Sequence, residues 1–219
     1  ETYGKLNEDW GVLGYYSTSD RDNMEDGDGN EIYGTAADQD LLFVKASGNL
    51  TENQYASLSY EKREEEGEFS ARPNWVVLEG AALYPSEAER DTLVANYRLD
   101  YSAMVYLEAT AYNTSSSFRG GRFDWLANID TYGFDIRNTS ETTNHVFTYG
   151  VDYRNDEVES GPAEGAVENA EEGSVLGVYA QAHSAINPEL TLSYGVRFDD
   201  YDFQQDILLD EYYGDPVTD

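Results

Sequence analysis

The sequence predicts an all-β protein: an antiparallel, up-and-down sheet of about ten strands that forms part of a larger barrel. Residues 190–203 alternate strictly, with Leu190, Leu192 and Tyr194 on one side and polar residues between them. A period of two is typical of a strand that separates two environments. Aromatic residues make up 14% of the chain, with 19 tyrosines against 5 prolines, which favours strands over helices. Finally, short and long polar connections alternate between the strand-like runs.

The composition narrows the possible classes of protein. With 219 residues and 40% hydrophobic content, the chain is long enough for one large all-β domain or two small ones. A net charge of −31 argues against a nucleic-acid partner, because phosphates would be repelled. There is no cysteine, and no apolar run approaches the roughly 18 residues of a membrane-spanning helix. The chain starts without a methionine and stops in a loop-like stretch, so we expect a piece of a longer protein.

Strand-like runs of similar length follow one another along the whole chain. A partial run around residues 2–6 precedes the first full one. Each run carries the alternation or the β-branched and aromatic content of a strand. The predicted strands are 10–20, 40–49, 54–65, 91–100, 102–114, 130–139, 144–155, 174–186 and 189–203.

The connections between these runs fall into two groups. Tight turns are predicted near 49–53, 99–102, 138–143 and 186–189, and long acidic loops at 21–38, 66–90, 115–129 and 156–173. Short turns at one end and long loops at the other are typical of outer-membrane barrels. A soluble sandwich with one wet face gives the same alternation within each strand. The segregation of the loops favours the barrel.

Alternation also assigns residues to the two faces of the predicted sheet. We expect Leu107, Val178, Leu192 and Val196 on the convex, lipid-facing side, because a charge there is costly. The opposite parity selects the concave side, which would line the lumen. The lumen-facing candidates for ligand contacts are Tyr106, Glu108, Tyr179, Gln181 and Arg197.

Motifs for metal binding or catalysis are weak. The stretch "DRDNMEDGDGNE" at 20–31 resembles a calcium loop, but neither possible register supplies the glycine and glutamate of an EF-hand. His145 and His183 fall on opposite faces of different strands, which makes a shared metal or haem site poor. No nucleophile elbow or phosphate loop is present. We therefore expect no enzyme, no cofactor and no metal site.

Three segments, read in order, resemble the barrel of TonB-dependent outer-membrane receptors, and most closely the haem or haemoglobin branch. They are "LFVKASGNLTENQYASLSYEKREEEGEF", "NHVFTYGVDYRND" and "VLGVYAQAHSAINPELTLSYGVRFDDYDF". The resemblance implies a 22-strand transmembrane β-barrel, of which residues 1–219 are a partial barrel domain. The plug domain, the energy-coupling segment and the C-terminal strand of such receptors have no counterpart in this chain.

The function implied by this resemblance is active import of an iron source, haem or a siderophore-like substrate, across the bacterial outer membrane. The implied partners are outer-membrane lipid and lipopolysaccharide, the plug domain, the TonB complex and the imported iron-containing substrate. Two other interpretations stay open. One is a soluble, secreted acidic all-β module that binds carbohydrate or calcium, and the other is a ten-strand outer-membrane protease.

Overall fold

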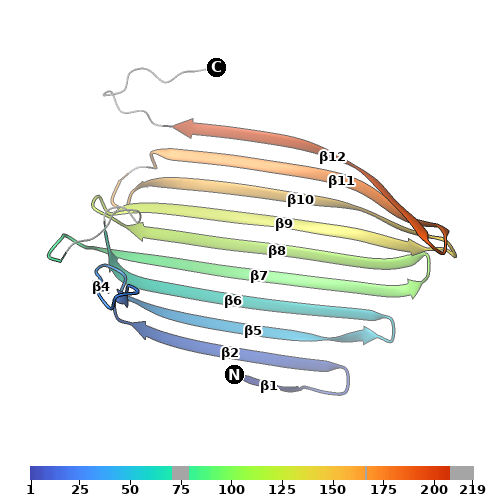
Figure 1. Cartoon of the computed structure of the whole chain (residues 1–219), viewed down its shortest axis with the longest axis horizontal. Helices are drawn as coiled ribbons and strands as arrows, with labels where there is room; N and C mark the ends of the chain where they lie inside the picture. The colour runs from blue at the N-terminus through green and yellow to red at the C-terminus, as the bar shows by residue number, and fades with distance from the viewer. Residues whose placement is uncertain (71–78, 166, 208–219) are drawn as a thin grey trace.

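The computed structural model describes residues 1–70, 79–165 and 167–207, and these residues form a ten-stranded sheet and a small separate hairpin (Figure 1). The order in the sheet is β1-β2-β5-β6-β7-β8-β9-β10-β11-β12, and all of its pairings are antiparallel. The hairpin pairs β3 (Met24–Glu25) with β4 (Glu31–Ile32). The strands of the sheet are β1 (Thr2–Lys5), β2 (Trp10–Arg21), β5 (Ala37–Thr51), β6 (Gln54–Phe69), β7 (Tyr84–Ser102), β8 (Val105–Gly120), β9 (Trp125–Glu141), β10 (His145–Pro162), β11 (Asn169–Asn187) and β12 (Leu190–Ile207).

The predicted up-and-down topology is confirmed. Each strand of the sheet pairs with its neighbour along the chain, and only the β3–β4 hairpin intervenes between β2 and β5. The sheet is curved, and the turns that join β5 to β6, β7 to β8, β9 to β10 and β11 to β12 lie at one end, the turn rim (Figure 1). The connection from β1 to β2 lies at the turn rim as well, and the strand ends at which β2, β6, β8 and β10 leave the sheet lie at the opposite end, the loop rim. A two-layer sandwich is therefore wrong, because all ten strands share one sheet.

The strands are mostly longer than the sequence predicted, and the large differences lie at the loop rim. At the turn rim the predicted ends are displaced by only a few residues, as where β8 begins at Val105 and β9 ends at Glu141. The predicted loop at 115–129 shrinks to the turn 121–124, and the one at 156–173 shrinks to 163–168. The predicted loop at 66–90 is shorter at both ends, since β6 runs to Phe69 and β7 begins at Tyr84, and its residues 71–78 lie outside the described ranges. Most of these extensions are rich in polar residues, and the apolar stretch Trp125–Ile129 of β9 does not alternate, so the extensions carry no period-two signal. The backbone ladder continues because its hydrogen bonds do not require an apolar face.

Cross-strand register sorts the side chains onto two faces, because directly paired residues point the same way. One row joins Tyr97 to Ala109, Ile136, Val151 and Val178. We call this side the apolar face. The adjacent row joins Arg98 to Glu108, Arg137, Gly150, Tyr179 and Arg197, and it lies on the polar face. Leu192 and Arg197 thus lie on opposite faces of β12, as the alternation predicts.

The apolar face carries a continuous belt that no other part of the described chain covers. Leu58 is 52% exposed, Val196 72% and Phe198 69%. On β12 the belt runs from Leu192 to Phe198, about 20 Å along the strand. We call this band the apolar belt. It contains no Asp, Glu, Lys or Arg, and its residues on β2 to β12 are Trp10, Val12, Gly14, Tyr16, Leu42, Val44, Ala46, Gly48, Ala56, Leu58, Tyr60, Leu93, Ala95, Tyr97, Leu107, Ala109, Ala111, Tyr132, Phe134, Ile136, Phe147, Tyr149, Val151, Leu176, Val178, Ala180, Leu192, Tyr194, Val196 and Phe198.

The apolar belt crosses the rows of paired residues obliquely. One row starts at Trp10, the first belt residue of β2, and ends at Phe198, the last belt residue of β12. The belt has therefore shifted by about 20 Å along the strands while crossing about 38 Å of sheet, at about 4.8 Å per strand. The strands therefore lean by about 30° from the normal to the belt, near the range by which strands of closed barrels tilt from the barrel axis. No helix in the described ranges is long and apolar enough to cross a membrane.

Candidate functional site

All five of the sequence-predicted candidates lie on the polar face. Tyr106 and Glu108 come from β8, Tyr179 and Gln181 from β11, and Arg197 from β12. Glu108 pairs with Arg137, and Tyr179 pairs with Arg197. The row that contains these pairs runs across the middle of β8 to β12, on the side opposite the apolar belt. The candidates therefore belong to one wall, although they come from distant parts of the sequence.

Arg197 is the centre of a charged cluster that spans three strands. Its Nη1 and Nη2 donate to the two carboxylate oxygens of Asp152 on β10, at 2.7 and 2.8 Å. Its Nε donates to Asp199 Oδ1 at 2.7 Å. The guanidinium also lies 5.7 Å from the ring centroid of Tyr179, within the range of a cation–π contact. The bidentate geometry holds the guanidinium in one plane.

A second group of contacts continues the cluster toward β8. The Tyr179 hydroxyl donates to Asp135 Oδ2 at 3.0 Å, two strands away. Arg137 lies 3.5 Å from Asp135 and donates to Glu108 Oε2 at 3.0 Å. We call the seven residues of both groups the wall network. Its members are Glu108, Asp135, Arg137, Asp152, Tyr179, Arg197 and Asp199.

Glycines on the intervening strands make these long reaches possible. A Cβ added to Gly177 would overlap the Arg197 guanidinium, which crosses β11 at this point to reach Asp152. A Cβ added to Gly150 would lie 2.8 Å from the Tyr179 hydroxyl oxygen, which crosses β10 to reach Asp135. The side chains of Arg197 and Tyr179 therefore lie flat against the sheet, and they leave the space next to the polar face open.

Three of the five predicted residues belong to the wall network, and the other two lie on the same face outside it. Glu108, Tyr179 and Arg197 belong to the wall network. Gln181 joins Tyr179 and Arg197 in lining a shallow hollow of about 370 Å³. Tyr106 shares the polar face, but within the described ranges no side-chain contact joins it to the network.

Sequence reasoning missed four members of the wall network: Asp135, Arg137, Asp152 and Asp199. The same alternation contains the signal for them, because each occupies a polar-face position of β9, β10 or β12. What the sequence does not contain is the pairing between strands. Without it, Asp152 and Arg197 are simply two charges 45 positions apart.

The structure offers a different account of the acidic stretch at 20–31. Asp26 Oδ1 accepts hydrogen bonds from the backbone N–H groups of Asp28 and Asn30, at 2.9 and 2.8 Å. The Asn30 side-chain amide also donates to this carboxylate. Asp26 thus closes the β3–β4 turn, as Asp commonly does in turns. In the described part of the chain, no group of three or more His, Asp or Glu residues is placed to hold a metal ion.

The two histidines make local contacts at the turn rim. His145 Nδ1 lies 2.8 Å from Ser184 Oγ, and His183 Nδ1 lies 2.7 Å from Ser193 Oγ. Register places His145 on the apolar face and His183 on the polar face, because His183 pairs with Val146, the neighbour of His145. They do not converge on a common site.

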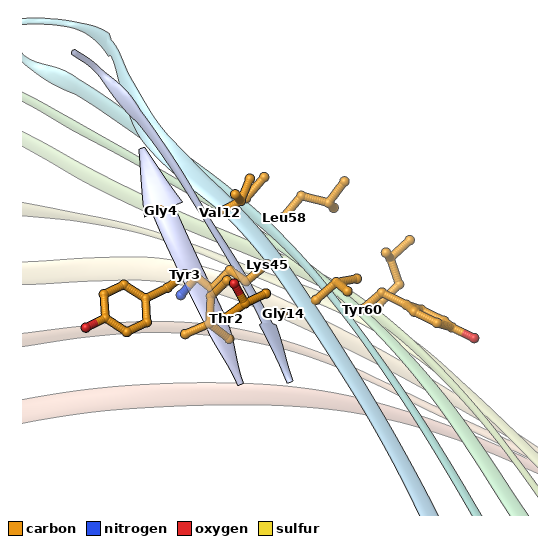
Figure 2. Close-up of a pocket in the computed structure, with 12 residues that line it drawn as sticks. Thr2, Tyr3, Gly4, Val12, Gly14, Lys45, Leu58 and Tyr60 are labelled. Carbon is orange, nitrogen blue, oxygen red and sulfur yellow. The ribbon is translucent and has the colours of Figure 1, made fainter. Parts of the chain in front are cut away.

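A second hollow, of about 620 Å³, lies on the apolar face near the β1 edge (Figure 2). It exists because Gly4, Gly14 and Ala46 carry little or no side chain, while Val12 and Leu58 stand around them. Its lining is mostly apolar and continues the surface of the apolar belt, but it also includes Thr2, Lys45 and Tyr60.

Comparison with known proteins gives results at two levels. No family model matches the sequence, and no curated protein matches it. The fold, in contrast, closely matches solved structures of outer-membrane transport proteins. The FrpB iron transporter from Neisseria meningitidis aligns with a TM-score of 0.79 at 16% identity over 92% of this chain and 37% of its own.

Two further structures extend this comparison. The hemophore receptor HasR from Serratia marcescens, solved with its hemophore HasA and heme, aligns with a TM-score of 0.75 at 21% identity, over 89% of this chain and 30% of its own. The copper transporter OprC aligns with a TM-score of 0.77 at 14% identity, over 91% of this chain and 33% of its own. This chain spans about a third of the length of these proteins. At such identities the likeness shows the fold.

Proposed function

We propose that residues 1–219 form part of the barrel wall of a TonB-dependent outer-membrane receptor that imports an iron source. The observation that carries this proposal is the division of one sheet into two faces. The uncovered apolar belt suits a lipid environment, like the outward-facing apolar band of outer-membrane barrels. The wall network on the other side suits a water-filled lumen. A soluble module would leave this belt in water.

The likeness to FrpB, HasR and OprC supports a transport role over an enzymatic one. These proteins carry different cargo by their own descriptions, namely iron, heme with a hemophore, and copper. The choice of iron, and of haem as the preferred form, rests on the sequence resemblance described above. On this proposal the loops at the loop rim capture the substrate, and the polar face lines its path. The plug and the TonB complex act through parts of the receptor beyond this chain.

The proposal is tested in a bacterial host that lacks its own receptors for haem and ferric siderophores. The full-length protein containing this chain is expressed, and growth is measured with haem or a ferric siderophore as the sole iron source. We expect it to fractionate with the outer membrane and to restore growth on one of these sources. Deletion of the host TonB gene should abolish that growth.

Two outcomes would contradict the proposal. The protein could be recovered in soluble form without detergent, which is incompatible with a lipid-facing belt. Alternatively, growth could be restored equally well without TonB, which would indicate a passive pore. An empty vector and an unrelated porin of similar abundance are the controls.

A further inference from the structure

We infer that the polar face of β5 to β7 is a binding wall for an anionic metal chelate, with Lys45 and Arg98 as its two cationic contacts. This inference deepens the proposed import function and rests on it. It assigns a substrate class, a small chelate with free carboxylate groups, to a region separate from the wall network.

In a chain with 44 acidic and 13 basic residues, a cation without a carboxylate partner is unusual. Most described arginines on the polar face are paired: Arg63 with Glu65, Arg90 with Glu61 and Arg154 with Asp156, besides Arg137 and Arg197. Four polar-face cations of the described ranges have no carboxylate within 4.0 Å, namely Lys5, Arg21, Lys45 and Arg98.

Two of these four cations lie away from the middle of the wall. Lys5 ends β1 at the turn rim, and Arg21 ends β2 at the loop rim, where its Nε donates to the Thr35 carbonyl at 3.3 Å. Lys45 and Arg98 lie at the level of the apolar belt, behind Val44 and Tyr97 on the opposite face. They are therefore the cations available to a molecule inside the lumen.

Two carboxylates neighbour Arg98 on the polar face, and it forms an ion pair with neither. Asp100 lies two residues further along β7, and Glu108 pairs directly with Arg98 across β7 and β8, but the Glu108 carboxylate is held by Arg137 at 3.0 Å. The Arg98 guanidinium instead lies over the Tyr55 ring, 5.2 Å from its centroid. Arg98 is exposed, so its remaining donors face solvent. Stacking on an aromatic ring leaves these donors free for a carboxylate.

Lys45 lies on the polar face of β5, two strands away from Arg98 on β7. It pairs with Ser59 on β6, and Figure 2 shows its side chain on the side of Tyr3, away from Tyr60. Two strand spacings and a four-residue offset place the Cα atoms of Lys45 and Arg98 about 16 Å apart. Both side chains are long, so an object of molecular size can contact both at once.

The surface between the two cations offers hydrogen bonds and no negative charge. Thr110 Oγ1 donates to Asn96 Oδ1 at 2.9 Å, and Asn96 Nδ2 donates to Ser57 Oγ at 3.3 Å. Ser57 pairs with Ser47, which extends the hydroxyl surface to β5. An anionic chelate placed here would meet two cations and a row of neutral polar groups. In the wall network, by contrast, four carboxylates already neutralise two arginines, which leaves no net attraction for an anion.

The test measures binding to the purified full-length protein in detergent. Ferric citrate is the anionic probe, ferrioxamine B is the non-anionic ferric comparison, and quenching of intrinsic fluorescence reports Kd. We expect ferric citrate to bind more tightly than ferrioxamine B. The double substitution Lys45→Ala with Arg98→Ala should weaken ferric citrate at least tenfold and leave ferrioxamine B unchanged. Raising NaCl from 50 to 500 mM should weaken binding to the wild type more than to the double variant.

Lys62→Ala and Arg119→Ala are the matched controls, because each removes one cation from the apolar side of the same sheet. They should change the Kd of ferric citrate less than twofold. An unchanged Kd in the double variant, or an equal loss in the controls, would overturn the inference. An unchanged Kd with a lowered unfolding midpoint would mean that Lys45 and Arg98 stabilise the fold by pairing with a carboxylate of the protein and do not bind the chelate. If binding behaves as expected but uptake fails, only the proposed import function is wrong.

Discussion

At the residue scale, Arg197 illustrates how a long side chain on this sheet chooses its partner. Its direct neighbour across the ladder is Tyr179, yet its charge partner is Asp152, one strand further. Gly177 lies between them and lets the guanidinium pass. The glycine is therefore part of the ion pair, although it carries no functional group. Glycine is required here because a Cβ would overlap the Arg197 guanidinium, and not because of its backbone conformation, which is that of an ordinary strand.

Gly177→Ala is expected to break the contact between Arg197 and Asp152. The added methyl group would overlap the guanidinium, and overpacking of this kind costs about 1–3 kcal/mol. The measurement is the unfolding midpoint of the full-length protein in detergent. Gly173→Ala is the control on the same strand and face, where the added Cβ meets only Phe203 at 3.5 Å. Equal losses in both variants would refute this role of Gly177.

The histidines lead to a second prediction at this scale. His145 and His183 contact serines at the turn rim and point to opposite faces. Neither is placed to ligate haem iron together with the other. His145→Ala and His183→Ala should therefore leave haem-dependent growth within about twofold of the wild type, at equal receptor abundance. Loss of haem binding in either variant would show that this chain supplies an axial ligand.

At the scale of the element, the strands continue well past the apolar belt. β8 extends to Gly120 and β9 begins at Trp125, so this hairpin ends in a tight turn. Gly121 and Asp124 both have positive φ, at 79° and 47°. Asp124 tolerates this conformation better than most residues, and its carbonyl accepts a hydrogen bond from the Ala163 N–H at 2.7 Å. Arg119 Nε and Nη2 donate to the Asp124 carboxylate at 2.8 and 2.7 Å.

This arrangement predicts a pH dependence for the β8–β9 turn. Hydrogen bonding to the Arg119 guanidinium holds the pKa of Asp124 below its ordinary range. A carboxylate with a lowered pKa stabilises the folded turn at pH values above its ordinary pKa, about 3.9. The contribution is lost as the pH falls through the lowered pKa of the folded state. The turn should therefore be indifferent to pH between 5 and 8 and should loosen only in strong acid.

The measurement is a carboxyl-carbon NMR titration of Asp124 in the wild type and in Arg119→Ala. Removal of the guanidinium should return the pKa of Asp124 toward 3.9. Asp26 is the internal control, since hydrogen bonds from Asn30 and the backbone lower its pKa independently of Arg119. A shift at Asp26 in the variant would indicate a general disturbance of the loop rim. An unchanged Asp124 titration would refute the role of Arg119.

At the scale of the whole molecule, the negative charge is concentrated on one side. Beyond the apolar belt, toward the loop rim, the apolar face becomes strongly acidic, and we call this region the acidic collar. In its most crowded row, Asp20, Asp38, Glu66 and Glu87 are successive cross-strand partners on four adjacent strands. The next residue in this row, on β8, is Arg119. The full collar comprises Asp20, Asp38, Asp40, Glu64, Glu66, Glu68, Glu87, Glu89, Asp91, Asp130, Glu157, Glu159, Glu172, Asp200, Asp202 and Asp206.

Directly opposed like charges destabilise a sheet, so the collar predicts a salt-dependent stability. Screening at higher NaCl should raise the unfolding midpoint of the full-length protein. Glu66→Gln, in the middle of the crowded row, should raise it at low salt by about 1–3 °C and reduce its salt dependence. Glu61→Gln is the control on the polar face, where the carboxylate pairs with Arg90 at 2.9 Å, and it should lower the midpoint. A rise in both variants would indicate an effect of net charge alone.

The sequence by itself determined the strand-by-strand character of this protein and the side of each residue. A period of two is a property of the extended backbone, so Leu107 and Glu108 are assigned to opposite faces without knowing their neighbours. The pairing within each hairpin also followed, because a short turn forces the two strands it joins to pair antiparallel. The strand ends at the loop rim did not follow, since ladder hydrogen bonds persist where no alternation of apolar and polar residues marks them.

Only the tertiary structure decided which charges meet. Arg98 and Arg197 occupy equivalent positions in their strands and look alike in the sequence. Asp199 lies two residues along the same strand, but register places Asp152 across Gly177 from Arg197, so the charge of Arg197 is neutralised by the wall network. Register places Arg98 beside Tyr55 and opposite a glutamate already held by Arg137, so its charge stays available. Pairing between strands depends on how far each strand slides along the next, and residues distant in sequence determine that together.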